Sequence, residues 1–85
     1  MTFLYVVKSE EEEYYIGCTE DLEKRLSEHN SGRSKYTSGK QWRLVYYEAY
    51  LSKKFAYERE RALKHNRRMN MFLLDRVKKS LGMLE

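Results

Sequence analysis

Two short runs of aromatic and branched residues, separated by a polar segment, constrain this chain more than any other feature. Residues 3–8 read FLYVVK and residues 14–18 read YYIGC, while SEEEE occupies positions 9–13. Apolar runs of this kind are typical of strands, and the polar segment is short enough to form a turn. We therefore predict an antiparallel hairpin. The two faces of its first strand are formed by Phe3, Tyr5 and Val7 and by Leu4 and Val6.

The pairing register of this hairpin decides where the tyrosines lie. If the turn pairs Lys8 with Tyr14, Tyr5 lies opposite Gly17 and Val7 lies opposite Tyr15. Every even register keeps Tyr5 and Tyr15 on one face, because side chains alternate along a strand. A glycine opposite Tyr5 then leaves space for the tyrosine ring or for a closely approaching ligand.

A helix is expected directly after the second strand. Thr19 is a plausible N-cap, and the helix should extend to about His29, before the sequence NSG. Leu22 and Leu26 form its apolar stripe, and Arg25 and His29 flank that stripe. Two polar side chains are thus expected beside the packed surface, near the hairpin.

The rest of the chain predicts one strand and two helices. The strand covers residues 42–50, and Ser52 can cap a helix of about 53–66. A last helix near 70–82 is expected to bury Phe72, Leu73, Val77 and Leu81. The fold class is α+β, in the order ββαβαα: a small three-stranded antiparallel sheet flanked by helices. We expect a single domain, residues 1–85, with a core of about 3–68.

The distribution of charge points to a polyanionic partner. The chain of 85 residues has a net charge of +4, yet residues 1–31 hold three basic and eight acidic side chains. Residues 32–85 hold fourteen basic and five acidic ones. Cationic surfaces bind nucleic acid by releasing condensed counterions, although an ordinary solvated surface is the alternative. The candidate nucleic-acid contacts are Arg33, Lys35, Tyr36, Lys40, Arg43, Arg67 and Arg68.

The cellular setting follows from what the sequence does not contain. Cys18 is the single cysteine, which excludes an internal disulfide and fits a reducing compartment. No apolar run approaches 18 residues, and the N-terminus has no signal-peptide pattern. We expect a cytoplasmic protein that has no membrane contact.

The segment YYIGCTEDLEKRLSEHNSG, at residues 14–32, carries a family resemblance when it is taken together with LYVV ten residues earlier. The chain from about residue 3 to 64 resembles the GIY-YIG nuclease domain, and KYTSGKQWRLVYYEAYLSKKFA is similar to small stand-alone bacterial members. The resemblance implies a metal-dependent phosphodiesterase core. It assigns motif roles to Tyr5, Tyr15, Gly17, Arg25 and His29, and the metal-binding role to Glu60, with Glu58 as the less favoured register.

The implied chemistry suits these residue types. Hydrolysis of a phosphodiester needs neutralised phosphoryl oxygens, an oriented water and a proton acceptor. Glu60 would hold one divalent ion, Mg²⁺ or Mn²⁺, while Arg25 offers a fork of donors to a phosphate oxygen. His29 titrates near neutral pH and can take or relay a proton. The two motif tyrosines either position water or, if a cation lowers the pKa of one of them, act as the base. Asn66 and Asn70 are candidates for the asparagine that many members have after the glutamate helix.

Each candidate also has an ordinary structural explanation. Tyr5 and Tyr15 suit a strand, and Cys18 is most simply a buried strand residue. His29 suits the C-terminal end of its helix. Arg25 has Asp21 and Glu28 within pairing distance on its own helix, and Glu60 has Lys64. Only the joint spacing outweighs these explanations.

Three classes of function remain open at this point. The first is a metal-dependent endonuclease acting on DNA. The second is a nucleic-acid-binding module on the same fold with little or no cleavage activity. The third is a protein-interaction adaptor whose basic face meets an acidic partner. The combination of tyrosines, Arg25 and Glu60 favours the first over the third, because an adaptor needs no carboxylate beside that arginine.

Overall fold

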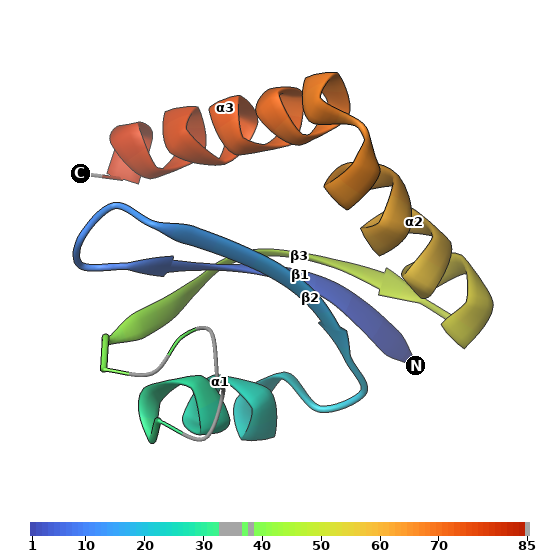
Figure 1. The fold of residues 1–85 in the computed structure, drawn as a ribbon, viewed down its shortest axis with the longest axis horizontal. Helices are drawn as coiled ribbons and strands as arrows, with labels where there is room; N and C mark the ends of the chain where they lie inside the picture. The colour runs from blue at the N-terminus through green and yellow to red at the C-terminus, as the bar shows by residue number, and fades with distance from the viewer. Residues whose placement is uncertain (33–36, 38, 85) are drawn as a thin grey trace.

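Three strands and three helices follow the predicted order in a computed structural model that describes all residues except 33–36, 38 and 85 (Figure 1). The elements are β1 (Thr2–Ser9), β2 (Tyr14–Thr19), α1 (Leu22–Asn30), β3 (Trp42–Tyr50), α2 (Lys53–His65) and α3 (Arg67–Leu84). The predicted fold class is confirmed.

The hairpin forms in the predicted register. Tyr5 pairs with Gly17, Val7 with Tyr15, and Lys8 with Tyr14. The turn between the strands is closed by backbone hydrogen bonds between Ser9 and Glu13 (2.8 Å) and between Glu12 and Ser9 (3.2 Å). Tyr5 and Tyr15 therefore lie on one face, as expected for an even register.

Strand β3 covers residues 42–50, as predicted, and pairs antiparallel with β1 on the side away from β2. The sheet order is therefore β2-β1-β3, which makes β1 the central strand. A register shift between Val6 and Val7 marks a bulge in the β1–β3 pairing. Strand β1 is buried from both faces, which explains why its apolar residues are continuous rather than alternating with polar ones.

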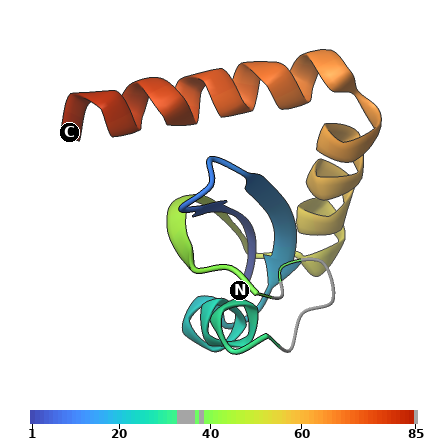
Figure 2. The same ribbon diagram turned by 60° about the vertical axis from the view of Figure 1, so that its left-hand side comes forward.

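Helices cover both faces of the sheet. Helix α3 lies on one side and α1 on the other, while α2 runs along the end of the sheet to join α3 (Figures 1 and 2). The face toward α2 and α3 holds the larger apolar core, formed by Leu4, Val6, Ile16, Leu63, Leu73 and Val77. The opposite face holds Tyr5, Val7 and Trp42, against which Leu22 and Leu26 of α1 pack. The candidate site belongs to this second, smaller cluster.

The start of α1 differs from the expectation, because Asp21 rather than Thr19 is the N-cap. The Asp21 carboxylate accepts a hydrogen bond from the Lys24 backbone N–H at 3.1 Å. Thr19 instead holds the connection, since its hydroxyl accepts from the Asp21 backbone N–H at 3.1 Å. Both residues are capping types, and the chain must turn away from β2 before a helix can begin.

Helix α3 begins at Arg67, three residues earlier than predicted. Asn66 ends α2 and also starts α3, because its side-chain oxygen accepts from the Met69 backbone N–H at 3.1 Å. Leu73 and Val77 are buried as expected and Leu81 packs against the core, but Phe72 is 66% exposed. The prediction of a buried Phe72 was wrong: the helix turns the stripe containing Leu73 and Val77 to the sheet, and Phe72 lies outside it.

Among the residues that the structure describes, no helix has the length and apolarity needed to cross a membrane.

Candidate active site on the α1 face of the sheet

Tyr5 lies flat across Gly17 on the neighbouring strand. A Cβ atom at Gly17 would stand 2.6 Å from the Tyr5 hydroxyl oxygen and 2.8 Å from the ring carbon that bears it. Such distances are far inside van der Waals contact. Of the two explanations for this glycine, the structure shows the first, since the space is filled by the Tyr5 ring.

The Tyr5 hydroxyl joins two side chains of α1. Arg25 donates to it through Nε at 3.2 Å, and His29 Nε2 lies 2.8 Å from it. Arg25 also forms the predicted ion pair with Glu28, at 3.3 Å. The two polar residues that flank the apolar stripe of α1 therefore lie beside the hairpin, as their positions on the helix predicted, and both contact Tyr5.

His29 is fully buried and uses both ring nitrogens. Its Nδ1 lies 2.6 Å from the Thr37 hydroxyl, and the Thr37 carbonyl accepts from Trp42 Nε1 at 2.8 Å. Burial lowers the pKa of His29, and the positive charge of Arg25 acts in the same direction. The ring is therefore neutral at pH 7, with one nitrogen able to donate and the other able to accept.

Thr37 and Trp42 complete this network, and sequence reasoning missed both as site residues. Asn30 fixes the start of β3 to the end of α1, because its side chain accepts from the Trp42 backbone N–H and donates to the Trp42 carbonyl at 2.9 Å. The signal in the sequence was the single tryptophan at the start of a predicted strand, since a buried indole needs a hydrogen-bond acceptor.

Burial raises the pKa of Tyr5 to about 12, and the negative charge of Glu60 contributes in the same direction. The phenol is therefore neutral in this state. Glu60, on α2, thus acts on Tyr5 of the central strand through its charge.

Tyr15 connects the α1 side of the site to α2. Its ring centroid lies 5.1 Å from that of His29 and 6.4 Å from that of Tyr5. On its other side, Lys64 Nζ lies 5.5 Å from the Tyr15 ring centroid. Tyr5, Tyr15, Arg25 and His29 are thus brought together directly, whereas Glu60 is reached through Lys64.

Glu60 lies on α2 with its side chain 19% exposed, and it lines a surface pocket of about 400 Å³. Its carboxylate accepts from Lys64 Nζ at 2.7 Å, which is the ordinary pairing considered for this residue. Glu58 lines the same pocket but is exposed. Of the two registers, Glu60 is the one whose charge acts on Tyr5.

The described residues contain no group of three or more His, Cys, Asp or Glu side chains that could hold a metal ion. A single carboxylate still fits Mg²⁺, because this ion keeps several waters and binds through one or two carboxylates plus substrate phosphates. Glu60, partly exposed and at the wall of a pocket, has the chemistry and the access for such an ion.

The two candidate asparagines have structural partners near this site. Asn66 caps α3, as described above. Asn70 donates to the Leu63 carbonyl at 3.2 Å and lines a pocket of about 250 Å³ together with Tyr15 and Lys64.

Cys18 donates to the Ala56 carbonyl at 3.3 Å, and burial raises its pKa to about 12, so that its thiol is unreactive.

The predicted nucleic-acid contacts are distributed over three regions. Arg33, Lys35 and Tyr36 lie outside the described residues. Lys40 forms ion pairs with Glu13 and, at 3.4 Å, with Glu11. Arg67 and Arg68 are exposed at the start of α3, where Arg68 lies 6.0 Å from the centroid of the Phe72 ring.

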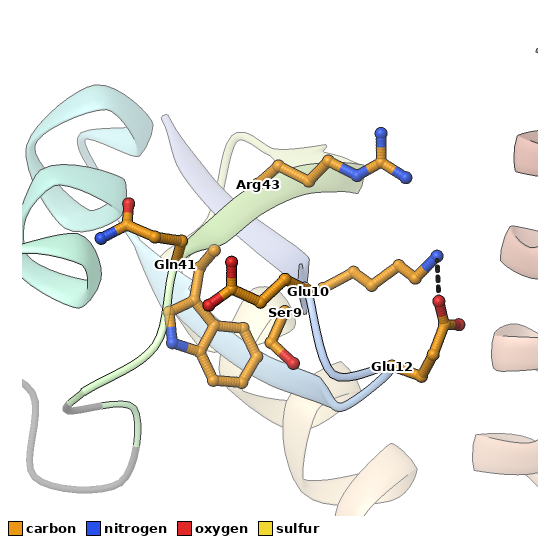
Figure 3. Close-up of a pocket in the computed structure, with 7 residues that line it drawn as sticks. Ser9, Glu10, Glu12, Gln41 and Arg43 are labelled. Carbon is orange, nitrogen blue, oxygen red and sulfur yellow. Dashed lines mark ion pairs between the residues drawn. The ribbon is translucent and has the colours of Figure 1, made fainter.

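Arg43 lies on β3 beside a pocket of about 390 Å³ that also carries Glu10, Glu12 and Lys8 (Figure 3). Lys8 and Glu12 form an ion pair of 3.3 Å across one side of it. The pocket is formed by the β1–β2 turn and the start of β3, and its charge is mixed. It is separate from the pocket that Glu60 lines.

The chain is similar to several known proteins. The chain is 41% identical over 66 residues to a UPF0213 protein from Clostridium perfringens, covering 75% of this chain and 71% of that one. It is 34% identical over 82 residues to a UPF0213 protein from Listeria welshimeri, covering 92% and 91%. The solution NMR structure of a UPF0213 protein from Bacillus halodurans matches with a TM-score of 0.55 and 34% identity, covering 88% of this chain and 84% of the other.

A family model described as the GIY-YIG catalytic domain matches residues 1–72, a range that includes every predicted site residue from Tyr5 to Arg68. Membership implies a nuclease-type fold and suggests that the chain binds nucleic acid. The chain belongs to the GIY-YIG domain family.

Proposed function

We propose that this protein is a divalent-metal-dependent endonuclease that hydrolyses phosphodiester bonds in DNA and acts as one domain. The observation that carries the proposal is the contact of the Tyr5 hydroxyl with both Arg25 Nε (3.2 Å) and His29 Nε2 (2.8 Å), within electrostatic range of Glu60. A purely structural tyrosine needs one hydrogen-bond partner, whereas this one has a cation and a neutral imidazole on the same oxygen.

The hydrogen bonds permit two proton arrangements at this oxygen. If the proton of His29 is on Nδ1, it is donated to Thr37, and Tyr5 donates to Nε2. If the proton is on Nε2, it is donated to Tyr5, and the Thr37 hydroxyl donates to Nδ1. In the second arrangement the Tyr5 oxygen accepts two hydrogen bonds, from Arg25 Nε and from His29 Nε2, and its own O–H remains available to donate to a water.

The site residues have separate roles in the proposed reaction. Glu60 holds the Mg²⁺ or Mn²⁺ ion, which when bound supplies positive charge to the phosphoryl oxygens. Arg25 is half-exposed and presents its guanidinium to a phosphate oxygen while Nε stays on Tyr5. Tyr5, Tyr15 and His29 position the attacking water. Its proton passes to the neutral ring of His29, or to Tyr5 once Tyr5 has given its own proton to His29 Nε2, to which it donates in the first arrangement.

The direct test is incubation of the purified protein with supercoiled plasmid and with single-stranded DNA, in Mg²⁺, in Mn²⁺ and in chelator. We expect nicking or linearisation that requires the divalent ion and stops with chelator. Cleavage that continues unchanged in chelator would contradict the metal-dependent reaction. RNA of the same length and sequence is the parallel substrate, and preferential cleavage of RNA would contradict the proposed choice of DNA.

A second function has one observation in its favour. Lys64 neutralises Glu60, and the described residues offer no larger group of metal ligands. This is what a nucleic-acid-binding module with the same fold would also show. Binding to DNA without cleavage in any metal, at protein concentrations that saturate the DNA, would establish that function instead.

A further inference from the structure

Lys64 lies between the proposed metal ligand and the second motif tyrosine. Its Nζ is 2.7 Å from Glu60 Oε2 and 5.5 Å from the centroid of the Tyr15 ring. Both the pocket lined by Glu60 and the pocket lined by Tyr15 and Asn70 include Lys64 in their walls. One ammonium group therefore lies close both to the Glu60 carboxylate and to the ring of Tyr15.

The exposure of this pair sets it apart from an ordinary pair on a helix. Lys79 and Asp75, also four residues apart, are 3.1 Å apart with side chains 77% and 62% exposed. Lys64 and Glu60 are 44% and 19% exposed. Lower exposure to solvent strengthens the attraction between the charges, and an aromatic face adds a favourable cation–π contact.

We infer that Lys64 is the resident counter-ion of Glu60 in the metal-free protein and that a divalent ion has to displace it; this inference rests on the proposed function. Mg²⁺ binds a carboxylate oxygen at about 2.0–2.1 Å. The Lys64 ammonium is within hydrogen-bonding distance of that carboxylate, so an ion there would be strongly repelled by it.

Once displaced from Glu60, the Lys64 side chain can move toward Tyr15. Lysine has a flexible four-carbon stem, and Lys64 already lies against Tyr15 at the wall of a second pocket. From there the ammonium is positioned to meet a phosphate of the bound nucleic acid. Lys64 is thus a positioning residue. When the ion binds, the Lys64 ammonium group leaves the Glu60 carboxylate and pairs with a phosphate of the substrate.

The test measures Mn²⁺ binding to the full chain without nucleic acid, by titration calorimetry or by the electron paramagnetic resonance signal of free Mn²⁺. Lys64→Met keeps the length and helix propensity of the side chain but removes its charge. We expect the Kd for Mn²⁺ to fall about two- to five-fold, the range that corresponds to a partly exposed ion pair. Lys64→Arg, which keeps the charge, should stay near the wild type.

Lys54→Met is the matched control. Lys54 lies on the same helix and lines the same pocket as Glu60, so its loss removes an equal charge from the same surface. It should change the Kd for Mn²⁺ less than Lys64→Met does. Equal changes in the two variants would overturn the inference, because they would show only a general effect of charge.

A second readout is the melting temperature, measured first without metal and then with Mn²⁺. Lys64→Met leaves Glu60 without its partner, so the melting temperature without metal should fall and should rise more on Mn²⁺ addition than in the wild type. If the wild type binds Mn²⁺ through Glu60 but Lys64→Met binds it no more tightly, the inference about Lys64 fails alone. If neither protein binds Mn²⁺, and Glu60→Gln changes nothing, the metal role of Glu60 fails as well.

Discussion

The candidate site has a buried half and an open half, and different kinds of interaction hold them together. The buried half consists of Tyr5, His29, Thr37 and Trp42, all of which are at most 7% exposed and joined by hydrogen bonds. The open half consists of Tyr15, Glu60 and Lys64, which are partly exposed and held by one ion pair and ring contacts.

The two halves differ in which contacts can change after folding. The hydrogen bonds of the buried half are fixed when the chain folds, whereas the ion pair of the open half can exchange partners. A change in the buried half must disturb packing, because no described buried side-chain nitrogen or oxygen atom lacks a partner and the ring of Tyr5 fills the space over Gly17. A change in the open half affects mainly charge. We therefore expect substitutions in the buried half to lower stability, and those in the open half to alter ion binding and rate with little loss of stability.

The largest effect is expected from Glu60→Gln in the open half. This change keeps the size and helix propensity of the side chain but removes the anion that holds the ion. Cleavage should fall by orders of magnitude, since the lost ion accounts for several kcal/mol of transition-state stabilisation. Binding to DNA without metal should hold or tighten slightly, because a negative charge near the phosphates is lost. Cleavage rates under single-turnover conditions and binding isotherms check both parts.

Arg25→Ala is the contrasting variant at the boundary between the halves. It should weaken both binding and cleavage, because the guanidinium meets phosphate in the ground state and in the transition state alike. An unchanged cleavage rate in Glu60→Gln would mean that Glu60 is only the surface partner of Lys64 and that the open half has no catalytic role.

The next effect concerns the approach of the nucleic acid. If Arg33, Lys35, Lys40 and Arg43 contact phosphates, the logarithm of the affinity for duplex DNA should fall with the logarithm of salt at a slope of about −3 to −4. Lys40 must then leave Glu11 and Glu13, and Lys40→Gln should reduce the slope by about one. Fluorescence anisotropy between low and moderate salt measures it. An affinity independent of salt would exclude a polyanion as the partner.

Gly17→Ala tests the buried half directly. The added methyl group would lie 2.6 Å from the Tyr5 hydroxyl oxygen, which is held by His29 and Arg25 and cannot yield without breaking those bonds. Overpacking of this kind costs about 1–3 kcal/mol in the free energy of unfolding, measurable by urea denaturation. Gly82→Ala in α3 is the control, since a Cβ there meets nothing within 4 Å and should stabilise the helix by about 0.5–1 kcal/mol. Equal stability in the two variants would contradict the tight contact.

Much of the site on the α1 face of the sheet follows from the sequence because strand geometry has a period of two. Once the hairpin was predicted, the positions of Tyr5, Tyr15 and Gly17 relative to one another were nearly determined. Helix α1 added Arg25 and His29 through the spacing of its apolar stripe. The bounds of β3 were predicted correctly for another reason, because residues 42–50 are a nearly continuous run of strand-forming residues.

The rest depends on tertiary contacts that no local pattern records. Phe72 was misplaced because Met71, Phe72 and Leu73 are consecutive, and only packing decides which of them faces the sheet. Thr37 reaches His29 from a loop, where sequence gives no register. Lys64 was considered only as an ordinary partner of Glu60, and its contact with Tyr15 required the packing of α2 beside the sheet.

The smallest expected effect is a pH dependence of stability that belongs to the buried half. His29 lies among Tyr5 of β1, Trp42 of β3 and the charged pair Arg25 and Glu28 of its own helix; burial, aided by Arg25, lowers its pKa below the ordinary value of 6.5. Below pH 6.5 the unfolded chain therefore binds a proton at this residue that the folded chain does not.

Stability should accordingly be complete above about pH 6.5 and should fall as the pH is lowered toward the folded pKa, by at most about 1.4 kcal/mol per pH unit for one proton. Urea midpoints at pH 5.5 and 7.5 measure this difference above the range in which most carboxylates titrate. His29→Gln should remove the slope, whatever its overall stability, whereas His65→Gln, at an exposed position of α2, should keep it. If the dependence of stability on pH survives in His29→Gln, another group is responsible for it. The buried half would then differ from the open half in its packing but not in its response to pH.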